Sequence, residues 1–240
     1  MSSSLSPPAL PPPALTDGQL QRLLAWLSPA FPIGAYTYSH GLETAIEAGL
    51  VTSAADLAEW LEIVLCHGSG LGDAIFLGQA WQAVVAGEET GLMDLSGRAM
   101  AFQPAAELRR ETAQQGRAFL AAIVKAWPCP ALARLQALNL PALPYPIVVG
   151  VACAGHGIAL RWSVTGYLHG FVANLVSAGV RLIPLGQSDG LAVMARLEPV
   201  VTTVTDTALE RGLEDLASAV PMVDWCAMRH ETQYTRLFRS

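Results

Sequence analysis

Residues 107–127, ELRRETAQQGRAFLAAIVKAW, carry the pattern that decides the fold class. Apolar or small side chains recur in this stretch at helical spacing, at Leu108, Thr112, Gly116, Phe119, Leu120, Ile123 and Trp127. A stripe with this period on an otherwise polar segment is typical of an amphipathic α-helix. Glu107 suits a first turn, where the helix dipole favours negative charge, and Pro128 and Pro130 interrupt any continuation. The stretch therefore predicts a long helix that starts near Pro104 and ends at Trp127.

Other segments repeat this helical pattern. Residues 53–56 resemble a capping box, and an apolar face follows them as far as Leu65. Further stripes cover 164–178, closed by Pro184, and 209–220, closed by Pro221. The glycine cluster 68–72 indicates a helix break.

Strand signals are weak. Residues 146–151 could form a buried strand, and 200–205 have strand propensity but could equally extend the helix predicted after them. Neither supplies the strand–helix alternation of an α/β sheet. We therefore predict an all-α fold, a single-domain bundle of roughly ten helices over residues 18–228. A proline-rich, disordered arm over 1–17 precedes it, and a tail over 229–240 follows it.

Composition excludes several functional classes. The 240 residues are 52% hydrophobic, enough for a substantial core, and the net charge of −6 argues against a nucleic-acid surface. The single lysine, Lys125, is not in a phosphate-loop context, so the chain is not a P-loop nucleotide hydrolase. We expect no membrane span and no secretory signal. Four scattered cysteines fit reduced thiols in a cytoplasm.

Two catalytic or metal-binding alternatives remain open. Residues 186–190, GQSDG, match the GxSxG nucleophile elbow, which would make Ser188 the nucleophile of a serine hydrolase. No clear strand precedes the motif, so a glycine-flanked turn also explains it. The pairs Cys153/His156 and Cys226/His230 could offer soft ligands to nickel in a stand-alone metal-binding protein. Two ligands do not complete a site, and we assign no catalytic residue, metal ligand or cofactor.

The C-terminal segment has an unusual composition for a chain end. Its last dozen residues hold three arginines, a tyrosine and an adjacent leucine–phenylalanine pair. Tyr and Arg concentrate binding energy at protein interfaces, so the segment indicates a partner-binding tail. The candidate contacts are Tyr234, Arg236, Leu237, Phe238 and Arg239. The alternative is that the tail folds back onto its own core.

Four segments together resemble the urease accessory family UreF. They are SPAFPIGAYTYSHGLE over 28–43, ELRRET over 107–112, RLIPLGQ over 181–187 and HETQYTRLFRS over 230–240. The resemblance spans residues 20–240. It implies an all-helical, usually dimeric cytoplasmic scaffold without enzymatic activity.

In this family the scaffold joins UreD (UreH in some species) and recruits the GTPase UreG. Hydrolysis of GTP is then coupled to nickel insertion into apo-urease. Carried onto this sequence, the resemblance favours the five tail residues as contacts, with Arg181, Tyr36 and Tyr38 as further candidates.

Overall fold

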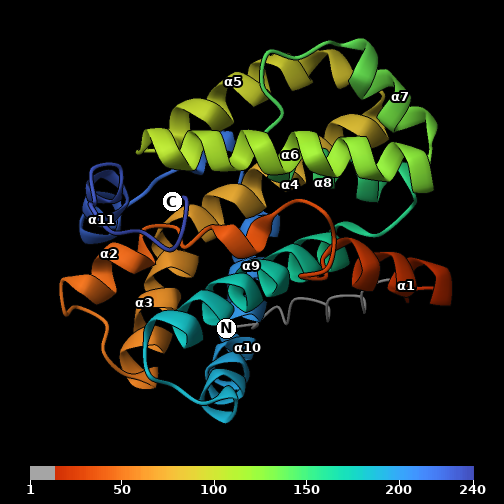
Figure 1. Cartoon of the computed structure of the whole chain (residues 1–240). Coiled ribbons are helices and arrows are strands. Elements are labelled where there is room, and N and C mark those ends of the chain that lie inside the picture. The colour runs from red at the N-terminus through yellow and green to blue at the C-terminus, as the bar shows by residue number, and fades with distance from the viewer. Residues whose placement is uncertain (1–13) are drawn as a thin grey trace, which may run out of the picture.

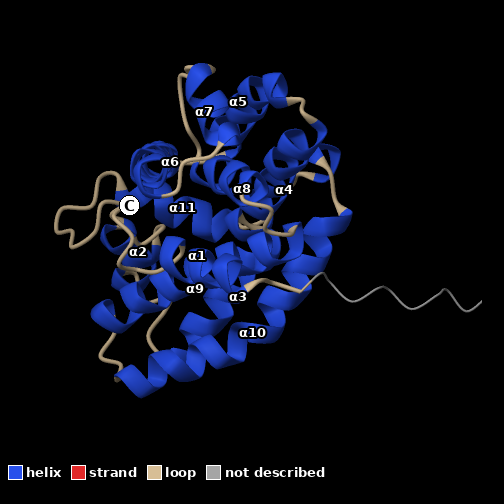
Figure 2. Ribbon diagram, turned by 90° about the vertical axis from the view of Figure 1, so that its right-hand side faces the viewer, coloured by secondary structure: helices blue, strands red, loops and turns tan. Residues whose placement is uncertain are grey.

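The computed structural model describes residues 14–240, and it confirms the all-α prediction (Figure 1). Figure 2 shows helices joined by loops, with no strand in this part of the chain. The described residues form eleven α-helices and three short 3₁₀ helices. The α-helices are α1 (Asp17–Trp26), α2 (Leu42–Glu47), α3 (Ala54–His67), α4 (Ser69–Ala86), α5 (Leu92–Phe102), α6 (Ala106–Ala126), α7 (Pro130–Ala137), α8 (Tyr145–Gly155), α9 (Leu160–Leu182), α10 (Gln187–Glu210) and α11 (Pro221–His230). The 3₁₀ helices are Ala35–Thr37, Glu89–Gly91 and Leu213–Asp215.

Helix α4 is the centre of the bundle. It packs against α3, α5, α8, α9 and α10, and most of its residues up to Ala80 are buried. A helix that is apolar on all sides can only be stable when other helices surround it. Its contact with α8 is especially close, because a Cβ atom at Gly150 would lie 2.4 Å from the carbonyl oxygen of Leu77.

The predicted helix over 104–127 is α6, and the predicted capping box at Ser53 is present. The Ser53 hydroxyl accepts the Asp56 backbone N–H, and the Asp56 carboxylate accepts the Ser53 N–H. The stripe over 164–178 lies within α9. Gly68 separates α3 from α4 as expected, whereas Gly70 and Gly72 lie inside α4.

One predicted helix does not form, and the two segments considered as possible strands are helical. The possible strand over 146–151 is part of α8, which is buried on all sides and so shows no amphipathic period. Residues 200–205 lie in the second half of α10, so the helical alternative for this segment is confirmed. The helix predicted over 209–220 does not form, because α10 ends at Glu210 and Pro221 is the first residue of α11. Proline suits the first helical position, where no N–H is needed.

Residues 54–86 are mostly apolar, and much of this stretch is buried in the core. This pair of helices, α3 and α4, is the one stretch among the described residues that is long and apolar enough to cross a membrane by length and composition. Its most apolar part is 72% buried against the rest of the protein.

Each predicted domain boundary lies near the end of a helix. Residues 1–13 of the predicted arm lie outside the described residues, and Thr16 caps α1, which begins at Asp17. At the other end, α11 continues to His230, so the first two residues of the predicted tail are helical. The chain end lies among α2, α6 and α11 (Figure 1).

A candidate functional site at the C-terminal surface

Three buried glutamates lie beneath the C-terminal segment. Glu43 comes from α2, and Glu107 and Glu111 come from successive turns of α6. Carboxylates are rarely buried unless they are paired, because removing a charge from water is costly. The first turn of α2 reaches this position because Gly41 adopts a left-handed φ of 79°, and a Cβ there would lie 2.8 Å from the Ala227 nitrogen on α11.

Glu43 holds the backbone of the tail. Its Oε1 accepts the Leu237 N–H at 2.6 Å, and its Oε2 accepts the Phe238 N–H at 3.0 Å. The same Oε2 lies 3.0 Å from Nε2 of His230, whose side chain is fully buried. Charge-assisted bonds of this kind are about twice as strong as neutral ones, so Glu43 fixes the path of the tail.

Glu107 completes this network. Its Oε2 lies 2.6 Å from Nδ1 of His230, and its Oε1 accepts a bond from Nη1 of Arg236 at 2.7 Å. The imidazole of His230 therefore bridges two carboxylates from two different helices. The sequence suggested Arg236 as a partner contact, but one of its N–H groups already bonds to Glu107 within the chain.

The last residues run beside the segment 37–39. The Arg239 N–H donates to the Thr37 carbonyl at 2.8 Å, and the Ser39 N–H donates to the Ser240 carbonyl at 2.8 Å. The Ser240 hydroxyl donates to Glu111 at 2.6 Å. The tail is thus ordered by its own core, which is the fold-back alternative for this part of the segment.

Three of the sequence-predicted contacts hold the tail within the chain: Phe238 and Tyr38 are buried, and Arg181 is exposed. Phe238 is only 4% exposed, and the Arg181 guanidinium lies 4.5 Å from the centre of its ring. Arg181 also donates to the Tyr36 carbonyl at 2.9 Å. Tyr38 is buried and donates its hydroxyl to Gln114 at 2.7 Å. Phe238 and Tyr38 therefore anchor the tail and do not present their rings to a partner.

Other predicted contacts face outward. Tyr234 is fully exposed, Leu237 is 65% exposed, and Tyr36, Arg236 and Arg239 are also exposed. In the tail, Leu237 and Arg239 point out while Phe238 and Ser240 point in. This alternation is the two-residue period of an extended chain.

Helix α11 adds an exposed apolar stripe that the sequence reading missed. Met222, Trp225 and Met228 are spaced by three residues and are each about half exposed. Trp225 and Tyr234 line a shared cleft of about 300 Å³, together with Arg229 and residues of α2. We call Met222, Trp225, Met228, Tyr234 and Leu237 the C-terminal surface. The spacing of the two methionines and the tryptophan was the signal that could have revealed it.

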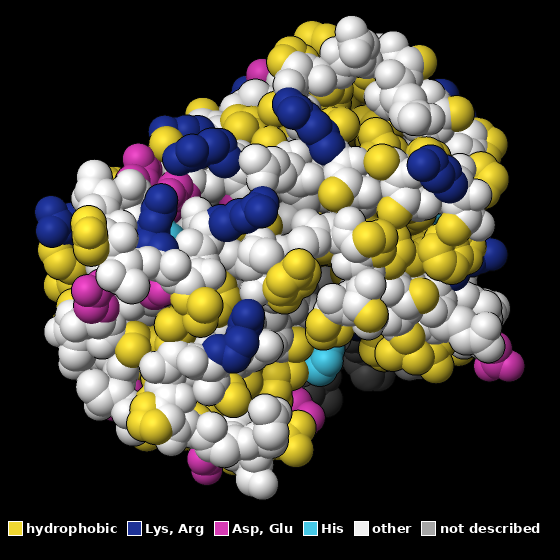
Figure 3. All heavy atoms as spheres, in the orientation of Figure 1, with side chains coloured by type: hydrophobic (Ala, Val, Ile, Leu, Met, Phe, Trp, Pro, Cys, Tyr) yellow, Lys and Arg dark blue, Asp and Glu magenta, His cyan; other side chains and the backbone are white. Residues whose placement is uncertain are grey.

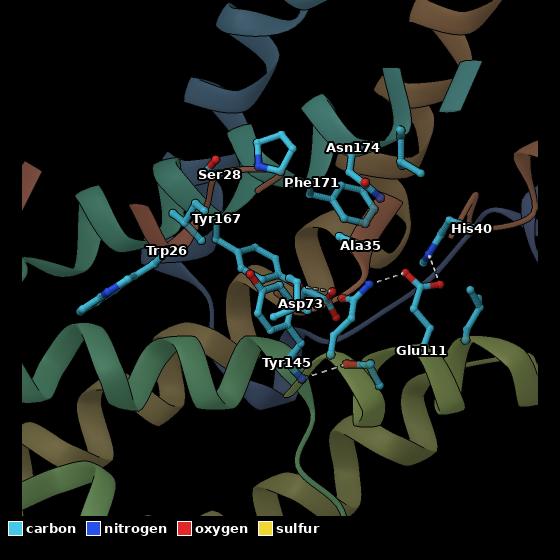
Figure 4. Close-up of a pocket in the computed structure, with 18 of the residues that line it drawn as sticks. Trp26, Ser28, Ala35, His40, Asp73, Glu111, Tyr145, Tyr167, Phe171 and Asn174 are labelled. Atoms are coloured by element: carbon cyan, nitrogen blue, oxygen red, sulfur yellow. Dashed lines mark hydrogen bonds and ion pairs between the residues drawn. The ribbon is translucent and has the colours of Figure 1, made fainter. Parts of the chain in front are cut away.

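An internal cavity lies on the other side of Glu111 (Figure 4). Its volume is about 60 Å³, so it is large enough to hold water. The Asp73 carboxylate accepts the Tyr167 hydroxyl there at 2.7 Å, and burial raises the pKa of Asp73 to about 6. The Nε2 atom of His40 lies 2.7 Å from the Ser69 hydroxyl oxygen, with which it forms a hydrogen bond. The Nδ1 atom of His40 lies 3.8 Å from the Glu111 carboxylate. Burial lowers the pKa of His40, but the negative charges of Glu111, Asp73 and Asp224 together raise it by more, so the net direction is upward.

The geometry gives no support to the hydrolase alternative. Ser188 is exposed in the first turn of α10, where the Asp189 carboxylate accepts the Gly186 N–H at 2.8 Å. No strand leads into this turn in the described part of the chain, so the strained elbow of a hydrolase does not form. His230 is the one histidine that follows Ser188 in the sequence, and it is buried between Glu43 and Glu107.

The cysteine–histidine pairs are also engaged or buried. Burial raises the pKa of the Cys153 thiol to about 12 and that of Cys226 to about 11, which disfavours the thiolate that binds metals. The Nδ1 atom of His156 lies 2.9 Å from the Ala152 carbonyl. Within residues 14–240, no group of three or more His, Cys, Asp or Glu side chains is arranged to hold a metal ion.

Comparison with known proteins identifies the family. The UreF family model matches residues 51–198, which is more than half of the chain. The chain belongs to the UreF family. A relative from Rhodopseudomonas palustris (strain BisB5), named urease accessory protein UreF, is 47% identical over the full length of both chains.

Two further relatives bear the same name. The protein from Bradyrhizobium diazoefficiens is 49% identical, covering 92% of this chain and 91% of its own. The protein from Granulibacter bethesdensis is 49% identical, covering 93% and 95%. The accessory role that these names give to the family is of the chaperone type and not catalytic.

Proposed function

We propose that this chain is a urease accessory scaffold that joins UreD (or UreH) and recruits the GTPase UreG. The assembly couples GTP hydrolysis by UreG to nickel insertion into apo-urease. We place it in the cytoplasm and propose that it forms a homodimer. Family membership supports the accessory role, and the C-terminal surface supports a role through protein contacts.

The observation that carries the proposal is a tail that is held in one conformation while two of its large side chains are exposed. Glu43 holds the tail backbone, and Glu107 and Glu111 hold the side chains of Arg236 and Ser240. Tyr234 and Leu237 face solvent. A pre-ordered segment loses less conformational entropy on binding than a disordered one. Tyr, Trp and Arg are also the residue types that dominate binding hot spots.

The available apolar area is large enough for a stable contact. Full burial of a large apolar side chain contributes about 1.5–3 kcal/mol. Trp225, Tyr234 and Leu237 together could therefore contribute several kcal/mol to association, before the entropic cost of association is subtracted.

Co-purification with UreD and UreG, with and without GTP, tests the proposal. The variant combines Tyr234→Ala with Leu237→Ala. The control is Leu191→Ala on α10, because Leu191 is 71% exposed and lies outside the C-terminal surface. We expect the double variant to lose at least tenfold of the recovered complex, with an unchanged melting temperature, and the control to assemble normally.

Two results would oppose this function. Normal assembly of the double variant would show that the C-terminal surface is not the contact. Fully active, nickel-replete urease in a host that lacks this protein would remove the accessory role itself. Sedimentation of the isolated chain tests the homodimer separately.

A further inference from the structure

Two adjoining hollows run along the outer face of α6. Arg110 and Gln114 line both of them. The first, of about 410 Å³, is also lined by Arg236 and Arg239, and the second, of about 480 Å³, by Arg109 and Arg117. We call the combined feature the arginine groove, defined by Arg109, Arg110, Arg117, Arg236 and Arg239.

The groove is strongly basic on an acidic protein. The whole chain has 14 basic and 20 acidic residues, and five of the basic ones line this groove. Glu107 is the single carboxylate in its lining, and it contacts His230 and Arg236. It also lies 3.9 Å from Arg110, whose side chain remains 64% exposed. In Figure 3, basic side chains stand out over the band that α6 occupies and beside the chain end.

Several of these charges are positioned but not neutralised. Arg109 donates to the Gln103 carbonyl at 2.7 Å, and Arg117 donates to the Pro141 carbonyl at 3.4 Å. A carbonyl holds a guanidinium without cancelling its charge, and five N–H donors leave others for a ligand. Among the described residues, Arg117 and Arg239 have no carboxylate within 4.0 Å.

We infer that the arginine groove binds an acidic segment of a partner protein, with carboxylates pairing with Arg110 and Arg117. This inference takes from the proposed function only that the chain acts in a protein complex. Arginine forks bind carboxylates with two parallel hydrogen bonds, and charge complementarity across an interface selects partners and speeds association.

The shape of the groove favours a peptide segment. Arg110 and Arg117 are seven residues apart on α6, which is about 10 Å along the helix axis. Acidic residues three positions apart in an extended segment, or seven apart in a helix, span the same distance. A single inorganic anion would contact one end only. A long nucleic acid would extend beyond the groove onto a protein of net charge −6.

The test uses a fluorescein-labelled octaglutamate peptide and the full chain, with binding followed by fluorescence anisotropy at 20–200 mM salt. The variant is Arg117→Glu. The control is Lys125→Glu, which makes the same charge change at an exposed position on the same helix but outside the groove. We expect Arg117→Glu to weaken peptide binding at least tenfold and Lys125→Glu to change it less than twofold. Binding should also weaken steeply as salt rises.

Three outcomes would overturn the inference. Equal binding by the two variants would show that the groove does not recognise the peptide. Full displacement of the peptide by equimolar inorganic pyrophosphate would indicate a small-anion site. A change in sedimentation caused by Arg117→Glu alone would assign the groove to contact with a second copy of this chain. None of these measurements includes UreD or UreG, so a failure here is distinct from a failure of the proposed function.

Discussion

The substitution Glu43→Gln should release the C-terminal tail without unfolding the protein. Glu43 accepts three hydrogen bonds, from the Leu237 and Phe238 amides and from His230. Glutamine has nearly the same size, but one of its two terminal atoms is a nitrogen that can only donate. At least one of the three donors then loses its acceptor.

The orientation of the glutamine amide that keeps the most hydrogen bonds sets the smallest loss of tail stability to expect. If the glutamine oxygen takes the place of Oε2, the bonds to Phe238 and His230 remain and the 2.6 Å bond from Leu237 is lost. A hydrogen bond to a charged group contributes about 1.5–3 kcal/mol. We therefore expect the docked tail to lose about 1.5–3 kcal/mol, which is roughly a 10- to 160-fold increase in the undocked fraction.

Limited trypsin digestion followed by mass spectrometry measures this opening. Cleavage after Arg236 removes residues 237–240, and it requires the tail to leave Glu43. Glu47→Gln is the control, because Glu47 lies one turn further along α2 and is exposed. We expect Glu43→Gln to lose the tail much faster than the parent or the control. Equal cleavage rates in all three proteins would refute the role assigned to Glu43.

Three further substitutions test the anchor and the core. Phe238→Ala should lower the free energy of unfolding by about 3–5 kcal/mol in urea titrations, whereas the exposed Leu237→Ala should change it by less than about 0.5 kcal/mol. Similar losses in both would contradict the in–out alternation. Gly116→Ala should destabilise by more than about 1 kcal/mol, since its Cβ would lie 1.8 Å from the carbonyl oxygen of Leu143 in the loop before α8. A Cβ at Gly97 meets nothing within 4 Å, so Gly97→Ala should be neutral or stabilising in the same titrations. Burial raises the pKa of Asp73 from 3.8 to about 6, so the folded state binds more protons than the unfolded state between these values, and this group makes stability fall as pH rises through that window. Asp73→Asn should therefore show a smaller loss of stability between pH 4 and 6 than the parent in thermal melts, and parallel curves would contradict it.

The helices that could be predicted from the sequence are those with one buried face and one solvent-exposed face. Helix α6 shows a clear stripe because its outer side carries Arg110, Gln114 and Arg117. Helix α8 is buried on all sides, so its apolar run has no period, and a buried helix and a buried strand look alike in sequence. Pro221 was ambiguous for another reason, because proline can follow one helix or begin the next.

The candidate site was predictable only in its composition. Tyr234 and Leu237 stood out as interface types, and the structure leaves both exposed. The sequence could not show that Phe238 turns inward, because that depends on the extended path set by Glu43. The buried glutamates escaped notice, since their partners lie more than a hundred residues away in the chain.

Hydrogen–deuterium exchange on the assembled complex with UreD and UreG tests the central claim most directly. The peptides of interest cover residues 222–237, and peptides around Leu191 on α10 serve as the internal reference. If the C-terminal surface is the contact, the amides over 222–237 exchange more slowly in the complex than in the isolated chain, while the reference is unchanged. Unaltered exchange over 222–237 in a complex that has demonstrably assembled would contradict the claim.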